Sequence, residues 1–244
     1  MSKLYFISDA HLGLGTADEE RAKELRLVQF LDCIKNDASA LFIVGDLFDA
    51  WFEYRTVIPK GFHRLFTKLE DLTNKGIEVH YLAGNHDYWI RDFFREQLGM
   101  KIYHDAFDIT VDGKKIYIHH GDGLANKDTG YRILKKVLRN RFNIWLYSLL
   151  HPDLGISLAR SSSRKSRHYT STKDYGEHDG MVLFAKKKID EGFHIVIMGH
   201  RHRPIFQELD NGVYINLGDW IAHNSYAEFH DGQISLKYWK PAQP

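Results

Sequence analysis

The sequence of 244 residues predicts an α/β fold in which sheets are layered with helices. Short apolar runs, typical of buried strands, alternate with helical patterns over the first part of the chain. Five of these runs end in polar clusters. Beyond residue 202 the pattern changes to short strands separated by turn signals. These three observations favour one α/β domain over an all-helical or all-β protein.

The predicted elements follow in order along the chain. Strands that end in polar residues are expected at 4–8, 40–44, 77–82, 115–119 and 193–198. Helices are expected between the early strands, at about 19–35 and 59–75. Short strands with turns at Asp210-Asn211-Gly212 and Asp231-Gly232 are expected at 204–209, 213–216, 225–230 and 233–239. This last group is expected to form a second, more antiparallel layer.

Residues 122–180 break the alternation and are expected to be a helical cap inserted into one domain that spans 1–244. The insertion carries eleven Lys and Arg against six Asp and Glu, a net charge of +5, whereas the remainder has a net charge of −4. Helices are expected at about 129–140, 142–150 and 153–160, followed by a turn rich in Ser, Arg and Lys at 161–168.

Composition limits the class of protein. The hydrophobic fraction of 43% and the charged fraction of 27% are typical of a soluble globular protein. A net charge of +1 gives no global sign of nucleic-acid binding. The N-terminus lacks the apolar region of a signal peptide, and no apolar run approaches the length of a membrane span, so a cytosolic location is expected. The single cysteine, Cys33, excludes an internal disulfide, and its apolar neighbours predict a buried thiol.

The polar clusters have the composition of a metal site. They read Asp9-x-His11, Gly45-Asp46, Gly84-Asn85-His86-Asp87, His120 and Gly199-His200-x-His202. Any one cluster alone is an ordinary set of strand-end polar residues, but five in succession should converge where strands end at their carboxyl side. Carboxylate, imidazole and amide ligands suit Mn²⁺, Fe or Zn²⁺. Seven ligands suit two ions that share a carboxylate, roughly 3.5–4 Å apart.

In this order the clusters resemble the calcineurin-like metallophosphoesterase family, whose pattern is DxH, GD, GNH with Asp or Glu, H and GHxH. The resemblance spans about Asp9 to His202 and implies a metallo-dependent phosphatase-like α/β/β/α sandwich. It implies that one ion is held by Asp9, His11 and His202, the other by Asn85, His120 and His200, with Asp46 bridging both. By the same resemblance, His86 stabilises the transition state or protonates the leaving oxygen, and Asp87 orients His86.

Within that family the chain resembles the UDP-2,3-diacylglucosamine diphosphatases of lipid A biosynthesis. The resemblance rests on the opening SDAHLG, on the helical segment after His120, and on GHRHRP followed by NGVYINLGDW. It implies hydrolysis to UMP and 2,3-diacylglucosamine 1-phosphate, with two divalent ions, Mn²⁺ favoured. It also implies a cytoplasmic enzyme in peripheral contact with the inner membrane and without a nucleic-acid partner. The substrate contacts that it implies are Asn85, His86, Asp128, Ser166, Lys173 and His200, and Thr170 stands where the pattern has Asn.

The inserted segment is compatible with a lipid substrate on its own pattern. Its apolar strip consists of Trp145, Leu146, Leu149 and Leu150, and the basic residues nearby are Arg132, Lys135, Lys136, Arg139 and Arg141. Apolar side chains of this kind can receive acyl chains, while Lys and Arg face phosphates. The same spacing also fits ordinary core packing with a solvated basic face.

One departure from the pattern leaves the substrate open. The best-known branch of these diphosphatases reads GNRD, whereas this chain reads Gly84-Asn85-His86-Asp87. Arg presents a fixed charged fork to phosphate, while His can also transfer a proton. The alternative is therefore a phosphodiesterase or pyrophosphatase of the same fold for a soluble nucleotide or another nucleotide-lipid. A nuclease, supported by the basic stretch at 160–167, and a non-catalytic scaffold are further alternatives, although a scaffold would be expected to lack ligands that are all present here.

Overall fold

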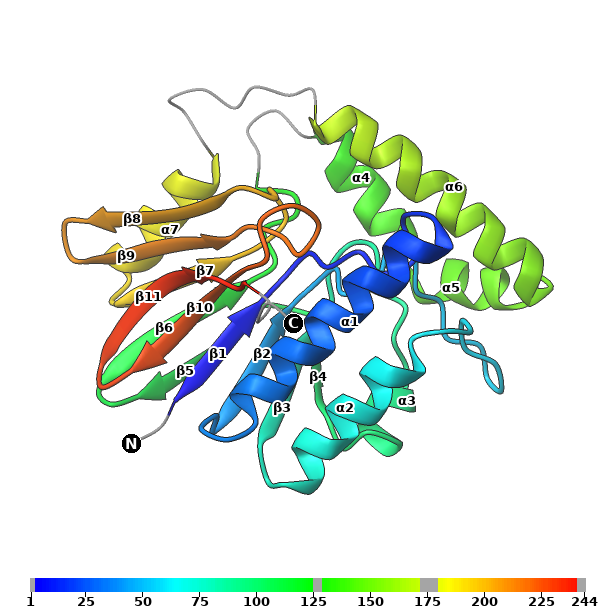
Figure 1. Ribbon diagram of the computed structural model, residues 1–244. Helices are drawn as coiled ribbons and strands as arrows, with labels where there is room; N and C mark the ends of the chain where they lie inside the picture. The colour runs from blue at the N-terminus through cyan, green and yellow to red at the C-terminus, as the bar shows by residue number, and fades with distance from the viewer. Residues whose placement is uncertain (1–2, 125–128, 172–179, 241–244) are drawn as a thin grey trace.

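Two stacked β-sheets form the middle of the molecule, with helices outside them (Figure 1). The computed structural model describes residues 3–124, 129–171 and 180–240, without the side chains of residues 129, 131–132 and 164–171. In chain order its elements are β1 (Leu4–Ile7), α1 (Ala17–Ile34), β2 (Ala40–Val44), α2 (His63–Asn74), β3 (Glu78–Leu82), α3 (Phe93–Glu96), β4 (Lys101–Tyr103), β5 (Phe107–Val111), β6 (Lys114–His119), α4 (Thr129–Leu138), α5 (Arg141–Ser148), α6 (Pro152–Ser171), α7 (Gly180–Asp190), β7 (Ile195–Met198), β8 (Pro204–Leu209), β9 (Gly212–Leu217), β10 (Ser225–His230) and β11 (Gln233–Tyr238).

The strand order places the five predicted cluster-bearing strands in two sheets. The first sheet has the order β11-β10-β1-β2-β3-β4 and the second has the order β5-β6-β7-β9-β8. Strands β1 to β4 are parallel to their neighbours along the chain, and β6, β7 and β9 are also parallel. The clusters after β1, β2 and β3 therefore come from the first sheet, and those after β6 and β7 come from the second.

Alternating side chains of the first sheet build two different cores. Leu4 and Phe6 of β1 face the second sheet, whereas Tyr5 and Ile7 pack against α1 and α2. This alternation follows from the two-residue repeat of a strand. On the far side, Met181 and other residues of α7 pack against β7 and β9. The order of layers is helix, sheet, sheet, helix, so the predicted α/β/β/α sandwich is confirmed.

Helix α1 shows how local sequence supports this layering. Thr16 caps its N-terminus in a capping box with Glu19, which satisfies backbone amides that the first turn leaves without partners. Leu27, Phe30 and Leu31 recur at helical spacing and are at most 1% exposed against the sheet. Cys33 lies on the opposite face and is exposed, so the prediction of a buried thiol is wrong.

Two other predictions about the elements are wrong. The strands beyond residue 202 do not form a layer of their own, because the β8–β9 hairpin joins the second sheet and the β10–β11 hairpin joins the first. The stretch at 161–168 is helix within α6 rather than a turn. Arg and Lys are good helix formers, and Ser is tolerated where its hydroxyl finds an acceptor.

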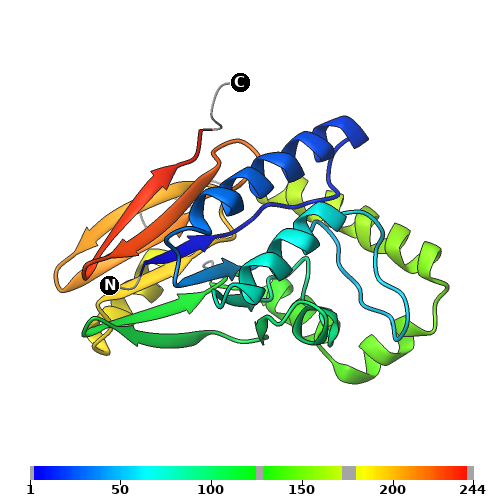
Figure 2. The ribbon, with the colours of Figure 1, turned by 60° about the horizontal axis from the view of Figure 1, so that its bottom comes forward.

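Helices α4, α5 and α6 lie together on one side of the sheets (Figure 1 and Figure 2). Trp89 in the loop after β3 donates from Nε1 to the carbonyl of Leu138 in α4 at 3.0 Å. The guanidinium of Arg139 lies 4.1 Å from the ring centre of Tyr88 in the same loop. These contacts hold the end of α4 against the loop that carries Asn85 and His86. No helix among the described residues is both long and apolar enough to cross a bilayer.

Candidate metal centre

The predicted ligands occupy strained positions at the strand ends. Nine described residues other than glycine have a positive φ, and five of them are Asp9, His11, Asp46, His200 and His202. This left-handed region costs side chains other than glycine on the order of 1–3 kcal/mol each, so the surrounding fold must hold it in place. Such strain collects at functional sites, where it fixes the direction of a side chain.

Two glycines in the clusters are required because a neighbouring ligand comes close to their backbone. A Cβ added to Gly84 would lie 2.1 Å from Oδ1 of Asp46, and one added to Gly199 would lie 2.5 Å from Oδ2 of Asp9. Both distances are far inside van der Waals contact. The Gly-Asn and Gly-His motifs therefore keep space for carboxylates that come from other strands.

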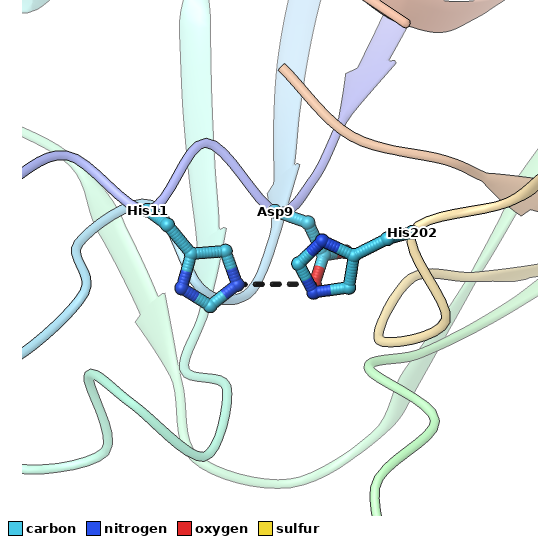
Figure 3. Close-up of side chains that lie close together, drawn as sticks. All are labelled: Asp9, His11 and His202. Carbon is cyan, nitrogen blue, oxygen red and sulfur yellow. Dashed lines mark ion pairs between the residues drawn. The ribbon is translucent and has the colours of Figure 1, made fainter. Parts of the chain in front are cut away.

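The first group of ligands comprises Asp9, His11 and His202, whose side chains point toward one another (Figure 3). Oδ1 of Asp9 lies 3.7 Å from Nε2 of His11 and 3.5 Å from Nε2 of His202. Ligand atoms about 2.0–2.2 Å from one ion lie roughly 3–3.6 Å apart, so the distance to His202 lies within this range and that to His11 lies about 0.1 Å beyond it. Within the described part of the chain, Asp9 Oδ1 and His11 Nε2 are buried without a hydrogen-bond partner.

The second group is connected to the first through Asp46. Oδ2 of Asp46 lies 3.6 Å from Nε2 of His11 and 3.2 Å from Nε2 of His120. Oδ1 of Asn85 is 3.1 Å from the same His120 nitrogen. Asp46, His120 and His200 also offer ligand atoms within 4.8 Å of one another. One oxygen of Asp46 therefore stands between the two groups, as a bridging ligand must.

Oxygen atoms lie on the far side of the His120, His11 and His202 rings. Nδ1 of His120 donates to the carbonyl of Val44 at 2.9 Å, which leaves Nε2 for the centre. Nδ1 of His11 lies 3.4 Å from Oδ1 of Asp49. The hydrogen bond of His120 fixes that ring and its tautomer, whereas the contact of His11 Nδ1 with Asp49 is at ion-pair distance without hydrogen-bond geometry.

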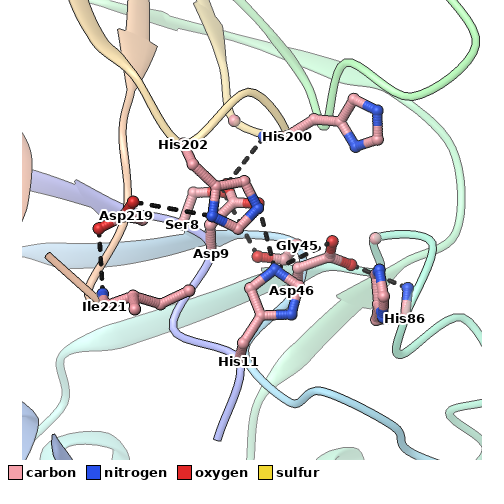
Figure 4. A network of polar contacts seen from close by, with 12 residues as sticks. Ser8, Asp9, His11, Gly45, Asp46, His86, His200, His202, Asp219 and Ile221 are labelled. Atoms are coloured by element: carbon pink, nitrogen blue, oxygen red, sulfur yellow. Dashed lines mark hydrogen bonds and ion pairs between the residues drawn. The ribbon is translucent and has the colours of Figure 1, made fainter. Parts of the chain in front are cut away.

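His202 has a carboxylate partner of the same kind. Its Nδ1 lies 3.7 Å from Oδ2 of Asp219. Figure 4 shows Asp219 beside His202 and bonded to the amide of Ile221, at 3.0 Å. Asp49 and Asp219 were not among the predicted site residues. A signal for Asp219 was present, because Gly218-Asp219 follows an apolar strand just as Gly45-Asp46 does.

The charges of the centre favour a cation. Burial opposes ionisation of Asp9 and Asp46, but neighbouring imidazoles outweigh it and keep the pKa of both carboxyl groups below the ordinary value. Burial likewise disfavours a charged His120, yet Asp46 raises the pKa of that ring to about 10. Burial lowers the pKa of His86 and of His200 to about 4, so both rings are neutral at pH 7.

His86 and Asp87 occupy different environments although they are neighbours. The amide of His86 donates to Oδ1 of Asp46 at 2.9 Å, and its Nδ1 donates to the carbonyl of Asp49 at 2.9 Å. Asp87 instead accepts hydrogen bonds from the amides of Gly84 and Leu47, each at 2.7 Å, and from the hydroxyl of Tyr81. Asp49 thus orients the His86 ring, while Asp87 ties together the loops after β2 and β3.

The comparisons with known proteins place this centre in a family. A family model described as calcineurin-like phosphoesterase matches residues 2–204. The chain belongs to this family. It is 35% identical over 254 residues to a UDP-2,3-diacylglucosamine hydrolase of Porphyromonas gingivalis, covering 97% of both chains. It is 31% identical over 238 residues to a protein of the same name from Shewanella baltica, covering 95% of both. Among solved structures, the E. coli phosphoesterase Yfce has a TM-score of 0.47 at 15% identity, covering 96% of this chain and 91% of that one.

The residues present fit the divalent metal ions that membership of the calcineurin-like phosphoesterase family implies. Three groups of candidate ligands lie together among the described residues: Asp9, His11 and His202; His11, Asp46 and His86; and Asp46, His120 and His200. The buried Asp9 Oδ1 and His11 Nε2, which find no partner in the described protein, lie in these groups. Buried polar atoms without partners are costly, and an ion would satisfy them.

A cavity of about 120 Å³ opens beside the centre, between the loops after β2 and β3 and the helices α4 and α6. Its polar and basic lining includes Asn85, His86, Lys135 and Arg139, and its apolar lining includes Trp89, Leu134 and Leu138. Of the other predicted substrate contacts, Asp128 and Lys173 lie outside the described residues. Ser166 lies in α6, where its side chain is also outside the description.

Proposed function

We propose that this protein is a two-metal hydrolase that cleaves the diphosphate of UDP-2,3-diacylglucosamine to UMP and 2,3-diacylglucosamine 1-phosphate in lipid A biosynthesis. The observation that carries the proposal is an Asp46 oxygen between two ligand groups, next to a cavity with both basic and apolar walls. The relatives that bear the name UDP-2,3-diacylglucosamine hydrolase match nearly the whole chain, which supports the same substrate here.

The proposed ligand sets follow the two groups. Asp9, His11 and His202 hold one ion, Asn85, His120 and His200 hold the other, and Asp46 serves both. Carboxylate, imidazole and amide donors favour Mn²⁺, with Fe or Zn²⁺ as alternatives. When bound, two such ions lower the pKa of a water molecule and offset the charge of phosphate oxygens.

His86 is the proposed proton donor to the leaving oxygen. Its Nδ1 is engaged by the carbonyl of Asp49, so Nε2 is the nitrogen left for the substrate. Burial lowers the pKa of His86 to about 4, and a phosphate placed beside it raises that pKa again by its negative charge. Asp87 contributes by holding the loops that carry Asp46 and Asn85.

The cavity walls suggest how the substrate lies. Lys135 and Arg139 line the cavity, each ion-paired with Asp122, and are the proposed contacts of the diphosphate, while Leu134, Leu138 and Trp89 are the proposed contacts of the acyl chains. Asp128, Ser166 and Lys173 are proposed contacts to the sugar or diphosphate, together with Asn85, His86 and His200. A nucleic-acid partner is not part of the proposal.

We also propose that α4 and α5 bring the enzyme to the cytoplasmic face of the inner membrane. Large apolar side chains of these helices, and of Leu149 at the C-terminal cap of α5, are exposed to solvent rather than buried in the core. The exposed fractions are 60% for Ile133, 64% for Phe142, 55% for Trp145, 53% for Leu146 and 63% for Leu149. The exposed basic residues Lys136 and Arg141 lie on the same two helices. Apolar side chains among basic ones suit an anionic lipid surface.

The experiment that tests the substrate compares two compounds with Mn²⁺ present. We expect UMP to be released from UDP-2,3-diacylglucosamine and not from UDP-N-acetylglucosamine, because the apolar wall binds only the acylated sugar. Equal release from both would favour the alternative, a pyrophosphatase of soluble nucleotides. Release from neither would reject the substrate while leaving the metal centre to be tested by ion binding.

The second candidate, a phosphodiesterase or pyrophosphatase for a soluble nucleotide, is favoured by one feature. His86 stands where the best-known lipid A branch has Arg, and an imidazole gives the cavity one fixed positive charge fewer. A His86→Arg variant tests what the imidazole contributes to turnover of the acylated substrate. If Lys135 and Arg139 already neutralise the diphosphate, this substitution lowers kcat without lowering KM for the acylated substrate.

A further inference from the structure

Asp49 joins three parts of the molecule through one buried residue. It is 2% exposed and follows Asp46 by three positions in the loop after β2. Its Oδ1 lies 3.4 Å from Nδ1 of His11, and its carbonyl accepts from Nδ1 of His86 at 2.9 Å. The same Oδ1 accepts from the hydroxyl of Ser163 in α6 at 2.8 Å. A hydroxyl from α6 therefore reaches the carboxylate behind a candidate metal ligand.

Ser163 is an unusual residue for this part of α6. Its neighbours Ser161 and Ser162 are exposed, whereas Ser163 is 5% exposed. The contact spans 114 positions of the sequence. A buried hydroxyl costs free energy unless it is hydrogen-bonded. Burial of the Ser163 face of α6 therefore requires an acceptor, and Asp49 supplies it.

The physical consequence concerns the direction of the His11 ring. A histidine that binds a metal through one nitrogen usually donates its other N–H to a carboxylate, and removal of that partner typically costs 10–100-fold in metal affinity. Oδ1 of Asp49 lies 3.4 Å from Nδ1 of His11, an ion-pair contact without hydrogen-bond geometry, and it is the carboxylate that stands next to this nitrogen. The hydroxyl of Ser163 donates to that same oxygen and so restricts the rotation of the carboxylate.

We propose that Ser163 and Asp49 form a positioning pair for His11, so that the ion site of Asp9, His11 and His202 is complete only when α6 is docked. This inference rests on the proposed metal role of His11. Because coupling between two events is reciprocal, ion binding also stabilises the docked α6. The helix that carries the proposed substrate contact Ser166 is thereby connected to the state of the metal centre.

The test measures Mn²⁺ binding by isothermal titration calorimetry in the full chain. We expect Asp49→Asn to weaken binding roughly 10–100-fold, and Ser163→Ala to weaken it by a smaller factor of roughly 3–10, because water can replace part of what the hydroxyl does. Ser161→Ala is the matched control, since it removes an exposed serine from the same helix. Circular dichroism of each variant verifies that it is folded.

A second measurement tests whether Mn²⁺ binding stabilises α6. Hydrogen exchange of the α6 amides is compared with and without Mn²⁺, and we expect the ion to slow exchange in the wild type and in Ser161→Ala but not in Ser163→Ala. A helix that is only packed against the core would not respond to the ion. If Ser163→Ala and Ser161→Ala have the same Mn²⁺ affinity and the same protection of the α6 amides from exchange, the proposed positioning pair of Ser163 and Asp49 is wrong. Failure of the wild type to bind Mn²⁺ would instead overturn the metal centre itself.

Discussion

At the scale of single residues, Asp46 is the side chain whose loss should do most damage. One of its oxygens lies within 3.6 Å of His11 and 3.2 Å of His120, so Asp46→Ala removes a ligand from both ions. We expect UMP release to fall below detection and the Mn²⁺ content, measured by atomic absorption, to drop from two ions per chain. Full metal content together with full activity would contradict a bridging carboxylate.

His86→Ala provides the contrasting result, because the ring of His86 is proposed to act on the substrate. The variant should keep its Mn²⁺ and lose roughly 10²–10⁴ in kcat, the usual contribution of a positioned proton donor. Stopped assays of UMP release and metal analysis on the same sample make the comparison. Loss of both ions in His86→Ala would show that the ring is needed to build the centre.

The sequence predicts the metal ligands better than the residues that contact the far side of the ligand rings. Asp9, His11, Asp46, Asn85, His120, His200 and His202 stand at strand ends in a recognisable order, and the structure brings them together. Asp49 lies in the same loop as Asp46, but a linear pattern does not show that its carboxylate turns toward His11. That direction depends on α6, which arrives from a distant part of the chain.

At the scale of secondary structure elements, His80 on β3 gives stability a dependence on pH. Its ring stacks on Phe42 of β2, with centroids 4.4 Å apart. Burial lowers its pKa below the ordinary 6.5, so the unfolded chain binds the proton more readily than the folded protein. The stability that His80 contributes is present above pH 6.5 and is lost as the pH falls through its lower folded pKa.

His80→Phe tests this dependence because phenylalanine keeps the stack and cannot be protonated. We expect the free energy of unfolding in urea to decrease less between pH 7 and pH 5 in this variant than in the wild type. His230→Ala is the control, since His230 is exposed on β10. An identical decrease in His80→Phe and wild type would contradict the assignment.

The exposed faces of α4 and α5 lead to a prediction about lipid surfaces. The double variant Trp145→Glu, Leu149→Glu should bind vesicles containing phosphatidylglycerol at least tenfold more weakly, because each large apolar side chain contributes roughly 1.5–3 kcal/mol when buried. Co-sedimentation with the vesicles measures the bound fraction. Leu183→Glu is the control, as Leu183 is 50% exposed on α7, which packs against β7 and β9 and is separate from α4 and α5. Equal sedimentation of the double variant and wild type would argue against membrane contact through α4 and α5.

The elements that the sequence analysis missed are short or lack a strong periodic pattern. Strands β4 and β5 have three and five residues, although Asp112-Gly113 between β5 and β6 is a recognisable hairpin signal. Helix α6 was predicted to end near residue 160 because Ser, Arg and Lys at 161–168 resemble a turn by composition. The helix continues to Ser171, and the buried contact of Ser163 with Asp49 within this stretch is one that composition does not reveal.

At the scale of the whole molecule, ion binding should stabilise the fold, because the ligands come from both sheets. Asp9 and Asp46 follow strands of the first sheet, while His120, His200 and His202 follow strands of the second. An ion at 100 times its dissociation constant adds about 2.7 kcal/mol to the stability. For a domain of this size we expect a rise in Tm of roughly 5–10 °C on replacing EDTA with Mn²⁺. Differential scanning calorimetry measures it, and an unchanged Tm would contradict a centre that joins the sheets.

The strand pairing of the first sheet also determines when a newly synthesised chain can complete its folding. Strand β1 stands between β2 and β10, and Leu4 faces Phe229 across that second edge. At about 5–20 residues per second, a ribosome needs roughly 11 to 45 seconds to pass from Leu4 to Phe229. Throughout that interval one edge of β1 has no neighbour, and His200 and His202 are absent for most of it. The emerging protein must therefore remain incomplete, and in need of protection from other chains, until nearly its last strands have been synthesised.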